Sequence, residues 1–238
     1  MDGFVHLHVH SNFSLLDGTI RVGELVGQAK ALGMDAVALT DHGNLFGAIE
    51  FYSAATEAGV KPILGIEAYI SPTTRDDRSM KNPQTAAYHL LLLAMNETGW
   101  RNLIKLSSRA YLEGFYYKPR IDRELLYEFS DGLIAATACL GGEVPSAVLA
   151  GQPDKARRIA GEYLEIFGRD RFFIELQKQG LPEQDQVNPQ LVALAKELGV
   201  GVVGTNDVHF LTRNDKDAHE VLTCISTGRT LNDENKMA

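Results

Sequence analysis

The chain has 238 residues, 45% of them hydrophobic and 23% charged, which suits a soluble globular protein with a sizeable core and excludes a disordered chain. Its formal net charge of −8 argues against nucleic-acid binding through a broad basic surface, because Lys and Arg contacts to phosphate dominate such binding. Two cysteines, Cys139 and Cys224, are too few for a disulfide framework, and neither a signal segment nor a long apolar span occurs, so we expect a cytoplasmic protein without a membrane segment.

The first predicted strand is the apolar run FVHLHV at residues 4–9, which overlaps the histidine-rich stretch HLHVH. Alternate side chains of a strand share one face. We therefore expect His6, His8 and His10 on one face and the intervening Leu7 and Val9 on the other. A row of imidazoles on one face is a candidate metal-binding feature.

A helix-then-strand unit recurs along the chain, with polar residues after each strand. KALGMDAVALTDH ends in Asp41 and His42, EAGVKPILGIEAY reaches Glu67, and KELGVGVVGTNDVH ends in Asp207 and His209. Glycine just past a helix end is a typical C-cap, and a continuous Val/Ile/Leu run is typical of a strand buried on both faces.

Three further apolar runs, YHLLLLA from 88, GLIAATA from 132 and FFIELQ from 172, bring the strands to about seven. Helical patterns separate most of them, at roughly 22–33, 45–58, 97–111, 153–167 and 185–198. This alternation favours a parallel α/β barrel, with a doubly wound sheet as the alternative. In such barrels the residues after the strands meet at one mouth.

Three stretches interrupt the rhythm. Residues 71–87 and 112–124 are predicted surface excursions beside the mouth. The tail, residues 212–238, contains one amphipathic helix and ends in polar residues. We expect residues 1–238 to form a single domain cut from a larger protein, with the tail leading towards the missing part.

The residues at the strand ends form a ligand set. Imidazole, carboxylate and thiolate groups suit zinc, manganese or iron. The set exceeds the three or four ligands of one zinc ion, so we expect two or three metals that share bridging carboxylates, a chemistry suited to phosphate-ester hydrolysis. The candidates are the strand-end residues His8, His10, His42, Glu67, Cys139, Asp207 and His209, together with His89 and, from a loop, Asp17; Asp41 also follows a strand, beside His42.

Three of these candidates have structural alternatives. Asp17, in an Asp-Gly turn, is also a possible cap for a helix that begins near Thr19. His89 stands at the start of its apolar run and not after it, which implies an earlier strand start or another strand direction. Cys139 is of a type that more often packs in a core.

Six motifs in order, LHVHSNFSLLDG, ALTDHG, GIEAY, YHLLLLA, ATACLGG and TNDVHF, resemble the polymerase-and-histidinol-phosphatase (PHP) domain. AYLEGFYYKPRID and ELQKQGLPEQ narrow the resemblance to the amino-terminal PHP domains of bacterial replicative DNA polymerase III alpha subunits. It runs from about residue 4 to residue 232.

The resemblance implies a distorted seven-stranded (βα)7 barrel, the PHP fold, with a trinuclear metal site. The family's nine ligand positions match the nine candidates above, which places the chain with the metal-retaining members. The implied activity is 3′–5′ exonuclease proofreading, in which hydroxide attacks the terminal phosphodiester. Asp17, His42, Glu67, Asp207 and His209 would act in catalysis as ligands of the metals and the activated water. The implied partners are the 3′ primer end of DNA and other replisome subunits; the sequence indicates no oligomeric state.

Five other residues receive lesser roles. His6 is expected to support a ligand by a hydrogen bond. Asp41 is expected either to point to the other face of its strand or, through a turn, to support a ligand, and Glu175 to be a buried partner of a ligand or of a basic residue. His219 is expected on an ordinary helix surface, and Cys224 in the core.

Lys118 and Arg120 are candidates to contact the DNA backbone near the mouth, and Phe115, Tyr116 or Tyr117 to stack on an unpaired base. The alternative is a solvated loop whose charges lie among aromatic residues. The chain lacks a Gly-rich phosphate cradle and a Ser-His-Asp arrangement.

Two other functions stay open. One is hydrolysis of a small phosphate monoester or pyrophosphate at the same metal site, which the acidic balance favours. The other is a structural module that stabilises a polymerase and docks partners without catalysis.

Overall fold

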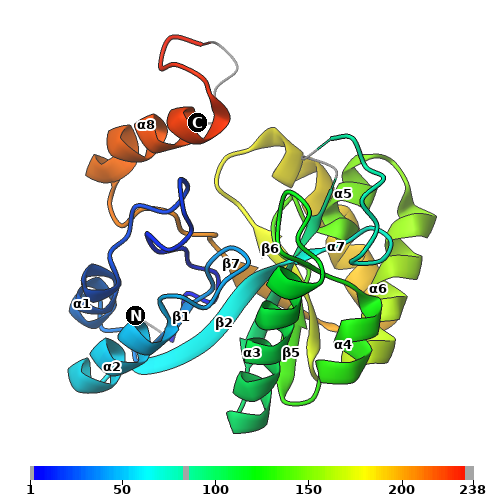
Figure 1. Cartoon of the computed structure of the whole chain (residues 1–238), viewed down its shortest axis with the longest axis horizontal. Helices are drawn as coiled ribbons and strands as arrows, with labels where there is room; N and C mark the ends of the chain where they lie inside the picture. The colour runs from blue at the N-terminus through cyan, green and yellow to red at the C-terminus, as the bar shows by residue number, and fades with distance from the viewer. Residues whose placement is uncertain (1–2, 83–85, 234–238) are drawn as a thin grey trace.

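The computed structural model describes residues 3–82 and 86–233 as a curled sheet flanked by helices (Figure 1). The strands are β1 Ala36–Leu39, β2 Lys61–Ile70, β3 Tyr88–Ala94, β4 Arg120–Ile121, β5 Leu133–Ala136, β6 Phe172–Gln177 and β7 Gly201–Thr205. The helices are α1 Val22–Ala31, α2 Ala48–Ala58, α3 Glu97–Leu112, α4 Arg123–Phe129, α5 Glu143–Leu149, α6 Pro153–Phe167, α7 Pro182–Leu198, a 3₁₀ turn Arg213–Asp215 and α8 Lys216–Thr227.

The sheet follows the order β1-β2-β3-β5-β6-β7, with β4 added beside β2. Neighbouring strands are parallel except around β3, which runs antiparallel to both β2 and β5. The α/β barrel class is confirmed, and the reversal of β3 is the main departure from the regular alternation that the sequence predicts. It also explains His89, because the start of a reversed strand lies at the same end of the sheet as the carboxyl ends of its neighbours: His89 pairs with Tyr69 near the end of β2.

Residues 6–10 connect the two edges of the sheet. The backbone oxygen of His6 accepts from Ala38 in β1, while His10 donates to the oxygen of Val208, just after β7. The segment forms only an isolated bridge, between Val9 and Val208, so the strand predicted at 4–9 is not a regular one.

The predicted alternation is therefore wrong at Leu7. A bend at His8 sends Leu7 into the apolar interior with Leu91 and Leu93, while Val9 packs beneath α1 and α2. His8 and His10 still share one face, but His6 packs its ring edge-on against Phe4 with centroids 4.9 Å apart.

Apolar faces of the helices hold the sheet in its curled form. The largest core cluster lies between the sheet and α3 to α7, and a second joins α1 and α2 to β1. In Figure 1, α1 and α2 lie beside β1 and the other sheet-packing helices lie at the opposite side, with α8 above the amino-terminal segment. Helices α4 and α5 were not predicted, since each is only two turns long. Among the helices of the described residues, none is long and apolar enough to cross a bilayer.

Candidate metal centre

Nine side chains converge where the carboxyl ends of the parallel strands meet the start of β3. They are the nine predicted ligands: His8, His10, Asp17, His42, Glu67, His89, Cys139, Asp207 and His209. They come from segments far apart in the sequence, and contacts of 4 Å or less link each to another member. His42, Cys139, Asp207 and His209 follow β1, β5 and β7, Glu67 lies within β2, His89 lies at the start of β3, and Asp17 belongs to a turn.

A first group of donors surrounds Asp207. Its Oδ1 lies 3.3 Å from Nε2 of His8 and 3.1 Å from Nε2 of His10. Glu67 closes the group, with Oε1 3.3 Å from the same atom of His8. Two imidazole nitrogens and two carboxylates at this spacing can bind one divalent cation.

A second group lies on the other side of Glu67. Its Oε1 is 3.0 Å from Nδ1 of His89 and 3.6 Å from Sγ of Cys139, and these two atoms lie 3.5 Å apart. The thiol therefore belongs to the site and not to the apolar core, and the mixed N/O/S donors suit zinc or iron.

A third group lies nearest the solvent. Oδ2 of Asp17 is 3.0 Å from Nε2 of His42 and 3.6 Å from Nε2 of His209. Nδ1 of His42 is 2.6 Å from Glu67 Oε2, so His42 joins this group to the others. Asp17 thus faces the site instead of serving only as a helix cap, and Arg21, not Asp17, is the N-cap of α1.

Four donor atoms of the first group are buried and lie close to other members of the site without a hydrogen bond of good geometry. Nε2 of His8 and His10, Oε2 of Glu67 and Oδ1 of Asp207 are buried without a hydrogen bond. Such atoms cost about 1–3 kcal/mol each when nothing satisfies them. Cations among them would remove that cost, so the residues fit the metal centre that the sequence predicts.

The carboxylate and imidazole groups of the site shift one another's pKa values. Burial opposes ionisation of Glu67, but the imidazoles of His89, His42 and His8 outweigh it and hold the pKa of Glu67 well below its usual range. Burial acts against the charge on His42 as well, yet Glu67 and Asp17 raise the pKa of His42 to about 10. Without metal, protonated imidazoles therefore compensate the buried carboxylates.

Other ligands are held uncharged. Burial and the neighbouring His42 lower the pKa of His10 to about 3. Burial and the charge of Glu67 raise the pKa of the Cys139 thiol well above its usual range. A bound cation would reverse the second shift, because a coordinating thiol loses its proton.

A buried network orients His8. Glu175 Oε1 is 2.8 Å from Nδ1 of His8, as predicted for Glu175, and also accepts from Gln177 and Thr205. With Nδ1–H donated to Glu175, His8 presents the Nε2 lone pair to the site, and this is how metal-binding histidines are commonly fixed.

His10 is oriented through two serines and Asp41. Asp41 accepts from the backbone N and Oγ of Ser11 and from Oγ of Ser14, at 2.7–2.8 Å. Ser14 in turn lies 2.9 Å from Nδ1 of His10 and accepts from the backbone N of His42 at 3.1 Å. The sequence singled out Asp41 but not Ser11 and Ser14, whose spacing in SNFS carries no strong signal on its own.

The backbone is strained beside two ligands. Ala138, just before Cys139, has φ 58°, and Asp207 has φ 47°. The left-handed region costs a non-glycine residue about 1 kcal/mol or more, and such strain clusters at functional sites. Here it turns a thiol and a carboxylate towards the same centre.

Two histidines differ from their predicted roles. His6 has no hydrogen bond to a ligand, and its Nδ1 is buried without a partner, so its predicted supporting role is wrong. His219, predicted on an ordinary helix surface, instead lies at the site, with Nε2 4.0 Å from Asp17 Oδ1.

Arg120 is also placed differently from the prediction. Its side chain is 0% exposed, and its guanidinium donates to the backbone oxygens of Gly114, Ala86, Arg75 and Asp77. This guanidinium links four backbone carbonyls from separate loop segments, and its complete burial keeps it from DNA. Its assignment as a phosphate contact is therefore corrected to a structural role.

Lys118 lies at the mouth as expected. Its Nζ is 5.2 Å from the ring centroid of Tyr69, which stacks on His42 with centroids 5.9 Å apart. Phe115 and Tyr117 are about half exposed, while Tyr116 donates to the oxygen of Met80 at 2.5 Å. An exposed ammonium therefore lies one aromatic ring away from the metal centre, and two exposed rings lie near it in the sequence.

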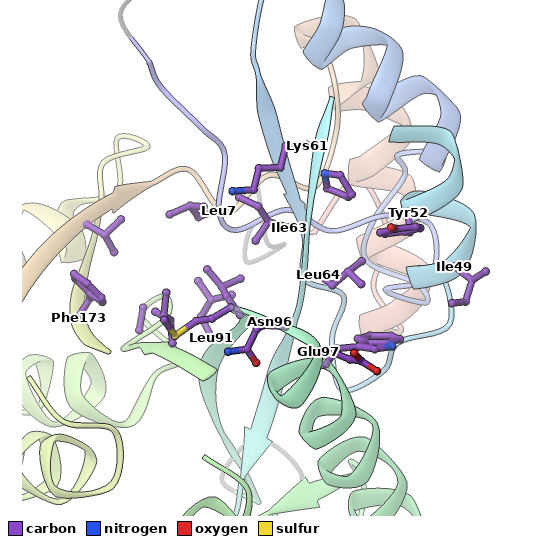
Figure 2. Close-up of a pocket in the computed structure, with 18 of the residues that line it drawn as sticks. Leu7, Ile49, Tyr52, Lys61, Ile63, Leu64, Leu91, Asn96, Glu97 and Phe173 are labelled. Atoms are coloured by element: carbon purple, nitrogen blue, oxygen red, sulfur yellow. The ribbon is translucent and has the colours of Figure 1, made fainter. Parts of the chain in front are cut away.

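A large apolar cavity lies elsewhere. It measures about 910 Å³ and opens beside the starts of β2 and β7 and the end of β3 (Figure 2). These strand ends are opposite to the ends that carry the metal centre. Leu7, Ile63, Leu91 and Phe173 line it, with Lys61 and Glu97 among its polar residues. Such an apolar lining offers no cluster of metal ligands, so we do not assign the chemistry to it.

Residues 6–179 match the PHP domain family, and all but Asp207 and His209 of the nine converging side chains lie in that range. The chain belongs to the PHP domain family.

Relatives of this PHP domain are replicative polymerase subunits. The chain is 51% identical over 236 residues to DNA polymerase III subunit alpha of Thermus aquaticus, with 98% of the chain and 19% of that protein covered. It is 47% identical over 234 residues to the subunit of Borreliella burgdorferi, with 98% and 20% covered. The chain thus spans about a fifth of the length of these relatives and matches their amino-terminal region.

Solved structures agree on the fold of this PHP domain. A proposed metal-dependent phosphoesterase from Bifidobacterium adolescentis has a TM-score of 0.53 at 18% identity, covering 88% of both chains. An amidohydrolase from Chromobacterium violaceum, solved with sulfate and no metal, has a TM-score of 0.54 at 15% identity, covering 87% of both. At these identities the likeness concerns the fold alone.

Proposed function

We propose that this PHP domain is a metal-dependent phosphodiester hydrolase that removes nucleotides from the 3′ end of DNA, a 3′–5′ exonuclease within a bacterial replicative DNA polymerase. The observation that supports the proposal is the convergence of nine side chains of metal-binding types, five of which have a buried donor atom without a hydrogen bond. The polymerase relatives favour DNA as the substrate.

Two or three ions, zinc, manganese or iron, would be held by the three donor groups. When bound, such ions supply Lewis acidity, which lowers the pKa of water and offsets the charge of a phosphodiester. Asp17, His42, Glu67, Asp207 and His209 would take part in catalysis as ligands. Glu67 has the central place, since its carboxylate faces all three groups.

The residues of the mouth would present the substrate. Lys118 would pair with a backbone phosphate, and the exposed rings of Phe115 and Tyr117 would stack on a terminal unpaired base. Tyr69, stacked on His42, shields one side of the ligand cluster from solvent.

The net charge of −8 implies that the rest of the polymerase delivers the DNA. In this proposal residues 1–238 are one domain of a larger chain, residues 212–238 lead towards the polymerase part, and other replisome subunits are partners in the cytoplasm. The acidic balance also favours a second candidate, hydrolysis of a small phosphate monoester or pyrophosphate at the same site.

The test compares substrates on the metal-loaded chain. A 5′-labelled primer with a mismatched 3′ end would be incubated beside a phosphate monoester and pyrophosphate, with Mn²⁺, Zn²⁺ or Fe²⁺. We expect stepwise shortening of the primer, abolished by combined Asp207→Asn and His209→Ala but unaffected by Asp35→Asn, an exposed control.

Hydrolysis of only the small substrates would replace the proposal with the second candidate. If the double variant folded like the unmodified chain and hydrolysed each substrate as fast, the site would have no catalytic role, and a structural module would be the better description.

A further inference from the structure

Helix α8 brings a tenth polar side chain to the metal centre. It lies above the amino-terminal segment in Figure 1, and from it His219 extends towards the loop that carries Asp17. The His219 side chain is 17% exposed, and its Nε2 is buried without a hydrogen-bond partner. A buried ring nitrogen without a partner is costly, so this atom needs a function or a nearby group that it can reach.

The nearest charged group is the outer oxygen of Asp17. Nε2 of His219 is 4.0 Å from Oδ1, while Oδ2 of the same carboxylate is 3.0 Å from His42 and 3.6 Å from His209. The two oxygens therefore face different partners: one faces the third donor group, and the other faces α8. A change of about 1 Å would bring His219 into hydrogen-bond range.

Two rings hold His219 in this position. Its ring centroid lies 5.8 Å from that of His209 and 5.2 Å from that of Phe210. The imidazole is thus packed between His209 and the neighbouring Phe210, and it cannot turn freely into solvent.

Asp17 is the ligand that most needs such a partner. Its side chain is 31% exposed and it belongs to a turn, with Leu16 at φ 61°, and not to a strand. A carboxylate on an exposed turn is free to rotate, and the loss of that freedom weakens cation binding. Ligating carboxylates are commonly fixed by a hydrogen bond to the oxygen that does not bind the metal.

We propose that His219 positions Asp17: its Nε2–H donates to Oδ1 and thereby aims Oδ2 at a cation shared with His42 and His209. The inference rests on the proposed metal centre and assigns α8 a part in it. Since Asp17 is otherwise held by its turn, displacement of α8 would weaken the cation of the third group and leave the two deeper groups occupied.

The test compares two replacements of His219. His219→Gln keeps an N–H donor at about the place of Nε2, and His219→Leu removes the donor at similar volume. Val221→Ala, at an exposed position of the same helix, is the matched control. Metal content after gel filtration and affinity by competition with a chelator are the readouts, with circular dichroism as the check on folding.

We expect His219→Leu to lose 10- to 100-fold in affinity for one ion, as is usual when a partner of a metal ligand is removed. His219→Gln and the control would stay within about threefold of the unmodified chain, because the donor is kept or untouched. In an Asp17→Ala background, His219→Leu would change the affinity no further, because the two residues act as one unit.

Equal metal affinity of the His219→Leu and His219→Gln variants would overturn the inference. It would also be overturned if His219→Leu lowered the affinity as much in the Asp17→Ala background as in the unmodified chain. If His219→Leu fails to fold, His219→Ala, which also lacks the donor, takes its place in both backgrounds with the same expected result. A chain that binds no metal would refute the centre and this role together. A metal-binding chain with the expected His219 effect but no exonuclease activity would refute only the proposed function.

Discussion

Replacing Glu67 by glutamine tests the central feature of the metal site. Glu67 is fully buried, and its two oxygens approach His8 at 3.3 Å, His89 at 3.0 Å and His42 at 2.6 Å. An amide has one acceptor oxygen and no charge, so glutamine can serve one cation at most and serves it weakly.

The size of the effect follows from the two oxygens. An interaction with a charged oxygen is worth about 1.5–3 kcal/mol, so the binding of two ions weakens by about 3–6 kcal/mol in total when both oxygens lose their charge. This corresponds to about 10²- to 10⁴-fold weaker overall binding. Without metal we expect Glu67→Gln to lower the free energy of unfolding by less than about 2 kcal/mol, because the facing imidazoles can release their protons.

The assay measures metal content and chelator competition, followed by urea unfolding with and without metal. Glu50→Gln, at an exposed position in α2, is the control. We expect the variant to lose at least one ion and most of the stability that metal confers. Full metal content with affinity within about threefold of the unmodified chain would refute the bridging role of Glu67.

Further predictions concern Arg120, Lys118 and His42. Arg120→Met should lower the unfolding free energy by about 2–4 kcal/mol in urea, because four carbonyls lose their donor; unchanged stability with lost DNA binding would restore its predicted contact with phosphate. Lys118→Ala should weaken binding of single-stranded DNA and reduce the salt slope by about 1, with unchanged stability because the side chain is exposed; an unaltered slope would remove Lys118 from the substrate path. Since the pKa of His42 is raised to about 10, this residue is protonated at pH 7.5 without metal and must release that proton to bind a cation, so affinity should rise with pH up to about 10. Calorimetry in two buffers of different ionisation enthalpy measures the release, and a proton count of zero would contradict this assignment.

The local sequence pattern predicts the long helices but not the short elements. Residues 153–167 form a helix with the predicted bounds, and α1, α2, α3 and α7 differ from prediction by up to three residues at an end. Short elements such as α4 and the two-residue β4 were not predicted, because packing and not periodicity stabilises them.

The sequence by itself determined which residues belong to the metal centre. A polar ligand type after an apolar run is a local pattern, and it indicated His8, His10, His42, Glu67, Cys139, Asp207 and His209, whereas Asp17 was inferred from an Asp-Gly turn and His89 from the resemblance to the PHP family. The helix-and-strand alternation likewise predicted a barrel of the α/β class.

Only the tertiary structure decided how these residues are used. The direction of β3 depends on which strands pair with it, and that pairing joins residues distant in sequence, so His89 was explained only by the curled sheet. Arg120, predicted at the mouth, is buried among backbone carbonyls, and His219, predicted on a helix surface, lies at the metal site. Both differences arise because burial depends on what packs against a residue. The division of nine ligands into three groups around Glu67 is a property of distances in space, which residue types and spacing do not encode.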